Sequence, residues 1–255
     1  MIKNFRKKIT SNYFLKRIMR RFKDKESSKF CINNFSYDTV MPFANYAPWL
    51  MDSEFLKVYD SIKNNTLVDI FRCYELWELT EKIHNLNRNA HFIEVGVWRG
   101  GTAGIIGRKL GLLKSASHLY LADTFTGVVK ISEKDTFYKG GEHSDTSQAI
   151  VENLLINYYD NCKILKGIFP DDTSHLINSN EKFGLCHIDV DVYESAKAIV
   201  SWIWERMIIG GVIIFDDYGF HTCDGITKYV NEQKLKSDRL IVHNLNGHAI
   251  LVKLA

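Results

Sequence analysis

The stretch FIEVGVWRGGT, residues 92–102, runs from a short apolar segment into a glycine-rich turn and then toward an apolar helix. A short apolar run of this kind is typical of a buried strand in a parallel sheet. Glycine lets the backbone of the turn approach a ligand closely, and the first turn of the helix offers free N–H groups. Because the spacing differs from the G-x-G-x-x-G of dinucleotide-binding proteins, the stretch indicates a nucleotide-type site without a pyrophosphate.

Around this stretch, short apolar runs alternate with amphipathic segments, which predicts a wound α/β fold with a mostly parallel sheet. Helical patterns cover 52–63 and 67–86, whereas residues 30–52 hold two of the three prolines and predict an irregular connection. The predicted strands are 92–95, 119–122, 163–165, 185–188 and 212–215, and a turn over 244–247 joins two last strands at 240–243 and 249–252.

Length and composition favour a single elaborated domain. With 255 residues and 45% apolar side chains, the chain can bury one substantial core. We expect a basic arm over 1–29, an irregular and helical cap over 30–88, and the main domain over 89–255.

The distribution of charge and the spacing of the cysteines argue against several classes of protein. Residues 1–29 hold eleven Lys and Arg against two acids, so the net charge of +3 comes from this arm and the rest of the chain is acidic. An acidic body argues against a nucleic-acid binder. Five cysteines without a C-x-x-C pair indicate neither a disulfide framework nor a zinc ribbon, and they favour a reducing compartment.

The relation to membranes has two interpretations. No apolar run reaches the roughly 20 residues of a membrane span, and no signal-peptide pattern opens the chain, so we expect a cytoplasmic protein. Apolar residues of the arm recur at roughly helical spacing among Lys and Arg. The arm is therefore either a solvated basic tail or an amphipathic helix in peripheral contact with the inner face of the membrane.

An acid ends the second predicted strand. Asp123 lies 27 residues beyond Gly96, at the end of LYLAD. A carboxylate at this place can accept two hydrogen bonds from ribose hydroxyls. A helix cap is the alternative role.

Two acidic motifs end later strands. HIDVDVYES (187–195) places Asp189 and Asp191 after one strand, and FDDY (215–218) places Asp216 and Asp217 after the next. The carboxyl ends of adjacent parallel strands converge on one crevice. Four acids there would repel one another, and oxygen ligands suit Mg²⁺, Mn²⁺ or Ca²⁺ rather than zinc. The two motifs therefore predict a divalent-cation site.

Four motifs, in order and at compatible spacing, resemble those of the macrocin O-methyltransferase family: EVGVWRGGT (94–102), ADTFTG (122–127), HIDVDVYES (187–195) and GGVIIFDDYG (210–219). The resemblance implies a Rossmann-like class I methyltransferase fold, with a mostly parallel seven-stranded sheet, helices on both faces and a C-terminal antiparallel hairpin. It also implies S-adenosylmethionine as the methyl donor, a homo-oligomer, and an acceptor sugar hydroxyl in a glycan, glycolipid or glycosylated metabolite.

The same resemblance implies roles for individual residues. Mg²⁺ or Mn²⁺ would be held by Asp189, Asp216 and Asp217, with Asp191 as the general base. The residues that would hold the cofactor are Glu94, Gly96, Gly100, Thr102, Asp123 and Asp189. The basic arm over 3–29 and the stretch 221–224 depart from the family pattern and leave the acceptor open.

The residues themselves leave the choice of base open. His143 lies in a long polar stretch, 124–147, which could fold over the site as a lid, and His143 and His221 both compete with Asp191 for proton removal. Tyr193 and Tyr218, beside the acids, are candidates for contact with a sugar ring.

Three other functions compete with sugar O-methylation. A glycosyltransferase could use Asp189-Val190-Asp191 as a D-x-D motif, but it would leave the glycine-rich turn unexplained. A catechol-type methyltransferase shares the fold and the metal but takes an aromatic diol. A non-catalytic binding module would leave four converging carboxylates without a purpose.

Overall fold

The structure, a computed structural model, describes residues 30–32, 35–37 and 46–255, and the chain divides into two units, 1–48 and 49–255. In the first unit, β1 (Phe30–Ile32) pairs antiparallel with β2 (Phe35–Tyr37), where the sequence predicts an irregular connection. Three-residue strands are too short for hydrophobic periodicity to reveal them. The basic arm over 1–29 lies outside the described residues.

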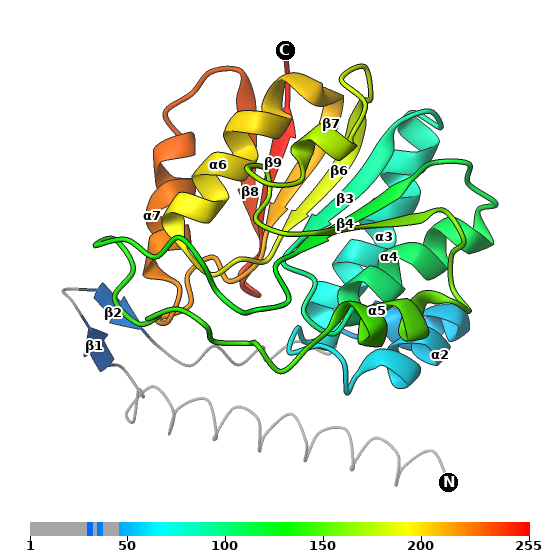
Figure 1. The fold of residues 1–255 in the computed structure, drawn as a ribbon, viewed down its shortest axis with the longest axis horizontal. Coiled ribbons are helices and arrows are strands. Elements are labelled where there is room, and N and C mark those ends of the chain that lie inside the picture. Colours follow the sequence, from blue (N-terminus) through cyan, green and yellow to red (C-terminus); the bar gives the residue numbers. More distant parts are fainter. Residues whose placement is uncertain (1–29, 33–34, 38–45) are drawn as a thin grey trace, which may run out of the picture. The chain divides into compact units, whose positions relative to one another are not determined.

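The second unit is built on a seven-stranded sheet in the order β5-β4-β3-β6-β7-β9-β8 (Figure 1). Strands β5, β4, β3, β6 and β7 are parallel, and β9 runs antiparallel to both β7 and β8. The fold class and the C-terminal hairpin are therefore confirmed. The strands are β3 (His91–Val95), β4 (Leu119–Asp123), β5 (Cys162–Lys166), β6 (Phe183–Ile188), β7 (Met207–Phe215), β8 (Arg239–His243) and β9 (Ala249–Lys253).

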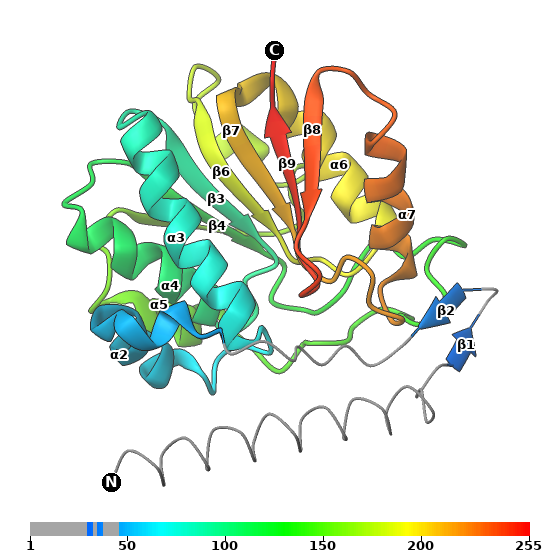
Figure 2. The ribbon, with the colours of Figure 1, turned by 180° about the vertical axis from the view of Figure 1, so that it is seen from behind.

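Helices cover both faces of this sheet, as Figures 1 and 2 show from opposite sides. One face carries α2 (Ser53–Ile62), α3 (Ile70–Leu86), α4 (Gly101–Leu112) and α5 (Gln148–Leu155), and the other carries α6 (Tyr193–Ile203) and α7 (Asp224–Gln233). Asp69 sets the start of α3, because its side chain accepts hydrogen bonds from the N–H groups of Phe71 and Arg72. Short 3-10 turns occur at η1 (Pro48–Met51), η2 (Ser174–Leu176) and η3 (Trp204–Arg206).

The core lies along the central strands. Every residue of β6 is buried, as are four of the five in β3, because helices cover both faces. The carboxyl ends of the five parallel strands share one edge, and the strand order reverses between β3 and β6. Open α/β sheets bind their ligands at such a reversal. Within the described ranges, none of the helices combines the length and apolar character needed to cross a bilayer.

Candidate active site

A cavity of about 300 Å³ lies at the carboxyl ends of the central strands. Its wall includes the four acids of the two motifs, from the ends of β6 and β7: Asp189, Asp191, Asp216 and Asp217. It also includes Gly96, Thr102 and Asp123, which the sequence assigns to the cofactor. The predicted metal and cofactor residues thus meet at one place.

Gly96 lies where the two halves of the site meet. The first half holds the predicted cofactor residues near the glycine-rich turn, and the second half holds the acids after β6 and β7. It follows β3 with a φ of +88°, and a Cβ at this position would lie 1.7 Å from the carbonyl oxygen of Asp189. The N–H of Asp189 in turn donates to the carbonyl oxygen of Val95 at 2.9 Å. Glycine is required here because the turn after β3 packs directly on the backbone that carries the first acid.

Asp123 holds the glycine-rich turn in shape. Its Oδ2 accepts hydrogen bonds from the N–H groups of Val97 (2.7 Å) and Trp98 (2.8 Å), and its Oδ1 accepts one from Phe125 (2.6 Å). A carboxylate oxygen offers two lone pairs, so Oδ2 is fully used and Oδ1 has one lone pair left for a ribose hydroxyl.

Two residues with expected cofactor roles lie outside the cavity wall. Glu94 is fully buried in β3, and its Oε1 contacts Nδ1 of His187 at 2.8 Å. Its side chain and that of Val95, which lines the cavity, point to opposite faces because side chains alternate along a strand. Gly100 caps α4 with a φ of +85°. The structure gives both residues structural contacts rather than a place at the cavity.

The carboxylates for the predicted ion converge. Ligand atoms of Asp189, Asp216 and Asp217 all lie within 4.8 Å of one another. Burial raises the pKa of Asp189 and of Asp217 well above the usual range, and their neighbouring carboxylates raise it further. Anions destabilised in this way favour a bound cation, and the oxygen donors fit a hard divalent ion.

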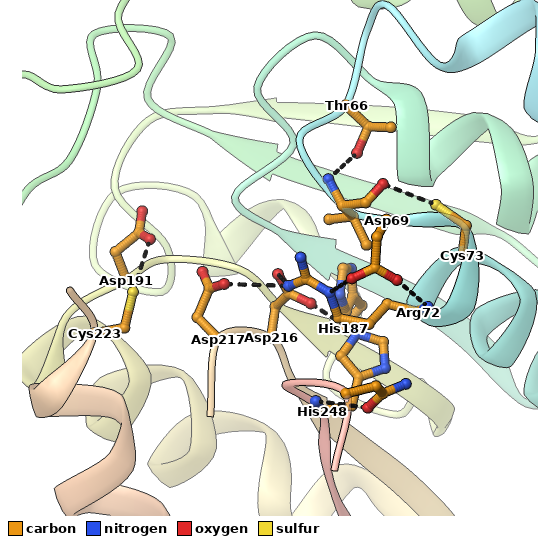
Figure 3. Close-up of polar contacts among 12 residues, drawn as sticks. Thr66, Asp69, Arg72, Cys73, His187, Asp191, Asp216, Asp217, Cys223 and His248 are labelled. Atoms are coloured by element: carbon orange, nitrogen blue, oxygen red, sulfur yellow. Dashed lines mark hydrogen bonds and ion pairs between the residues drawn. The ribbon is translucent and has the colours of Figure 1, made fainter. Parts of the chain in front are cut away.

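Asp216 is the exception among the four acids. Burial opposes its ionisation, but His248 and Arg72 bring its pKa down to about 2. Arg72, on α3, donates from Nη1 to Oδ2 of Asp216 at 2.5 Å and to Oδ1 of Asp217 at 3.2 Å (Figure 3). The sequence does not single out Arg72, because an arginine in a helical pattern is most simply expected on the surface.

Asp191 lines the cavity and is in contact with Tyr138. Its backbone adopts a φ of +64°, and its Oδ1 accepts a hydrogen bond from the hydroxyl of Tyr138 at 2.7 Å. Burial raises the pKa of Asp191, while the bond from Tyr138 opposes this rise. A carboxyl with a raised pKa is a better general base near neutral pH. Tyr138 lies in the stretch 124–147, so the predicted lid supplies a contact to the acid.

The four candidate substrate residues have different positions. His143 lines the cavity, whereas Tyr193, Tyr218 and His221 do not. The hydroxyl of Tyr193 donates to Glu232 at 2.6 Å, and the hydroxyl of Tyr218 bonds to Asn231 at 2.9 Å. The structure therefore brings only His143 to the reaction space.

Comparisons with known proteins show the family of this chain. Residues 61–247 match the family model described as macrocin-O-methyltransferase (TylF). The chain is similar to the mycinamicin III 3''-O-methyltransferase of Micromonospora griseorubida, with 26% identity over 199 residues, 72% of this chain and 76% of that protein. It is also similar to the 8-demethyl-8-(2,3-dimethoxy-alpha-L-rhamnosyl)-tetracenomycin-C 4'-O-methyltransferase of Streptomyces olivaceus, with 24% identity over 177 residues, 65% of this chain and 67% of that protein.

Solved structures share the fold. The O-methyltransferase NovP matches with a TM-score of 0.63 and 21% identity, over 75% of this chain and 82% of that one. An O-methyltransferase from Bacillus cereus in complex with SAH matches with a TM-score of 0.52 and 17% identity, over 80% and 91% of the two chains. The family match contains all four acids and the glycine-rich turn. The chain therefore belongs to the macrocin O-methyltransferase family and is an S-adenosylmethionine-dependent O-methyltransferase.

Proposed function

We propose that this enzyme methylates a sugar hydroxyl of a glycan, glycolipid or glycosylated metabolite, with Mg²⁺ or Mn²⁺ held at the acid cluster. The observation that carries the proposal is the convergence of Asp189, Asp216 and Asp217 within 4.8 Å, beside the cofactor cavity. The Streptomyces olivaceus relative is named for 4'-O-methylation of a rhamnosyl-tetracenomycin, which supports a sugar acceptor.

Cofactor binding would use the first half of the site. Gly96 and Thr102 line the cavity at the turn after β3 and the start of α4, and Oδ1 of Asp123 would accept a hydrogen bond from a ribose hydroxyl. The stretch 124–147 contributes Val128, Tyr138 and His143 to the same wall. A lid of this kind would exclude water from the methyl-transfer step.

The acids in the second half of the site would hold the divalent ion and remove the hydroxyl proton. A divalent ion held by Asp189, Asp216 and Asp217 would supply positive charge that stabilises the alkoxide character developing on the acceptor oxygen. Asp191 would remove the hydroxyl proton while the oxygen attacks the methyl carbon in line with sulfur. The new C–O bond forms as the S–CH₃ bond breaks, and the electron pair of that bond stays on sulfur.

A labelled-methyl assay tests the proposal. Tritiated S-adenosylmethionine is incubated with the enzyme, Mg²⁺ and three acceptor sets: cell-envelope glycans, glycosylated metabolites with their matched aglycones, and catechols. We expect the tritiated methyl group to be incorporated into sugar-bearing acceptors but not into the aglycones. Incorporation should be lost when a chelator is added. Transfer to catechols alone would instead favour the catechol-type alternative and contradict the proposed acceptor.

Membership of a methyltransferase family argues against two of the three competing functions considered from the sequence. A D-x-D glycosyltransferase and a non-catalytic binding module would both contradict the match over residues 61–247 to a methyltransferase family.

A further inference from the structure

Three buried side chains from different parts of the sheet face one another next to the acid cluster. They are His187 in β6, Asp216 after β7, and His248 before β9. Their exposed fractions are 0%, 2% and 0%, and one ligand atom from each lies within 4.8 Å of the other two. Figure 3 shows both histidines beside Asp216, on the side away from Asp191.

One of the inward-facing atoms has no partner, and the other two form an ion pair. Over the described part of the chain, Nε2 of His187 has no hydrogen-bond partner, whereas Nε2 of His248 and Oδ1 of Asp216 lie 2.7 Å apart as an ion pair. A buried polar atom without a partner is unfavourable, so a bound group within reach of Nε2 of His187 would be favoured.

The outer nitrogen of each imidazole is held by a carboxylate. Nδ1 of His187 lies 2.8 Å from Oε1 of Glu94, and Nδ1 of His248 lies 2.6 Å from Oε2 of Glu75. When Nδ1–H donates to a carboxylate, the lone pair of Nε2 is left free to bind an ion. Proteins commonly orient metal-binding histidines in this way.

The local charge also favours a cation. Three carboxylates, Glu75, Glu94 and Asp216, surround the two rings, and Arg72 supplies one permanent positive charge. The two imidazoles therefore lie among more carboxylates than fixed positive charges, which favours a bound cation.

We propose that His187, His248 and Asp216 form a second cation site, for a first-row transition ion such as Zn²⁺, distinct from the oxygen-only site and sharing Asp216 with it. Two imidazoles and one carboxylate suit Zn²⁺, Co²⁺ or Fe²⁺, whereas Mg²⁺ prefers oxygen. Because the ligands come from β6, β7 and the turn between β8 and β9, the ion ties the C-terminal hairpin to the parallel sheet and fixes the orientation of Asp216.

Cobalt titration tests the second site. Full-length protein is stripped of metal, saturated with Mg²⁺ to fill the oxygen-only site, and titrated with Co²⁺ while the visible ligand-field absorption is recorded. We expect one equivalent to bind. Glu75→Gln should weaken binding by about 10–100-fold, the usual effect of removing a carboxylate that orients a ligating histidine, and His248→Gln should weaken it more.

Two controls separate this site from the methylation site. His175→Gln changes an exposed histidine in η2 and should leave Co²⁺ binding unchanged. Asp189→Asn removes a ligand of the oxygen-only site alone, so the Co²⁺ signal should persist even where methyl transfer is lost. Failure of the proposed function and failure of the second site are therefore distinguishable.

Two results would overturn the second site: no Co²⁺ uptake under Mg²⁺ saturation, or equal affinity in the parent and His248→Gln proteins. Because variants at buried histidines can unfold, X-ray absorption of the Zn²⁺-loaded parent protein gives an independent test. Two imidazole ligands are expected around the zinc, and a zinc without imidazole ligands contradicts the proposal.

Discussion

At the residue scale, the proposed proton removal depends on Asp191, whose Oδ1 accepts a hydrogen bond from Tyr138. Replacing Asp191 with Asn keeps the shape of the side chain but removes its ability to accept a proton. We expect turnover to fall by about 10²–10⁴-fold, the usual contribution of a positioned general base, while binding of S-adenosylmethionine and Mg²⁺ persists. Steady-state kinetics with calorimetry measures both, and Asp60→Asn, an exposed acid, serves as the control. Near-normal turnover would transfer the role to His143, the other candidate base in the cavity wall.

Tyr138→Phe tests how Tyr138 changes the pKa of the Asp191 carboxyl. The Tyr138 hydroxyl bonds to Asp191 and lowers the pKa of that carboxyl, against the rise that burial causes. Loss of the bond should raise the pKa further, so the acidic limb of the turnover–pH profile should move to higher pH. Tyr158→Phe, which removes a hydroxyl at the exposed contact with Ser61, is the matched control. An unmoved acidic limb would mean that Asp191 is not the titrating base.

At the element scale, α3 supplies charge to strand ends that are distant in sequence. Arg72→Gln leaves Asp216 and Asp217 without their arginine. We expect the ion-free protein to lose about 3–5 kcal/mol of unfolding free energy, because breaking a buried pair leaves uncompensated charge. Added Mg²⁺ should restore part of the loss by supplying positive charge to the same carboxylates.

Denaturant unfolding in chelator and in Mg²⁺ measures the effect of Arg72→Gln. Arg108→Gln is the control, because its pair with Glu54 is about one-third exposed on both sides and such pairs contribute about 0–1 kcal/mol. Equal losses in the two variants would show that Arg72 does not act as the counter-charge of the acids.

The elements themselves were largely predictable from sequence. β3 and β6 are buried on both faces, and their mostly apolar sequences made them recognisable although each holds one fully buried polar residue, Glu94 or His187. Helix α3 differs from its helical pattern only at the start, where Asp69 caps it. The contacts between elements were not predictable. Arg72 lies 144 residues from Asp216, and His248 lies 173 residues from Glu75, so no local pattern joins them.

At the scale of the whole molecule, the acid cluster links cation binding to the stability of the fold. In the ion-free protein the pKa values of Asp189 and Asp217 are raised, so the folded state holds more protons than the unfolded state. The stability they contribute is full below the unfolded pKa and is lost as pH rises through the raised values. Mg²⁺ would bind the ionised carboxylates in the proposed site, so its stabilising effect should grow with pH.

Thermal unfolding with and without Mg²⁺, over a series from about pH 5 to about pH 8, checks this linkage. The expected result is a difference in Tm that widens as pH rises. A difference that stays constant or narrows would show that the carboxylates do not titrate with ion binding.

Topology explains why the sequence located so much of the site. In a wound sheet the strand ends meet at one edge, so Gly96, Asp123, Asp189 and Asp216 had to lie close together once the strands were assigned. Glu94 and Gly100 show the limit of this reasoning. Both belong to the same motif, but the alternation of side chains along β3 and the cap of α4 keep them out of the cavity wall.

The proposed metal site requires the acids at the ends of β6 and β7 to share one divalent ion. Calorimetric titration of Mg²⁺ into the parent enzyme with bound S-adenosylhomocysteine, and into Asp189→Asn and Asp217→Asn, tests this directly. We expect one Mg²⁺ per chain in the parent and a loss of that binding in each variant, although Asp189 and Asp217 come from different strands. Full Mg²⁺ binding in either variant, with the fold intact, would contradict the shared site.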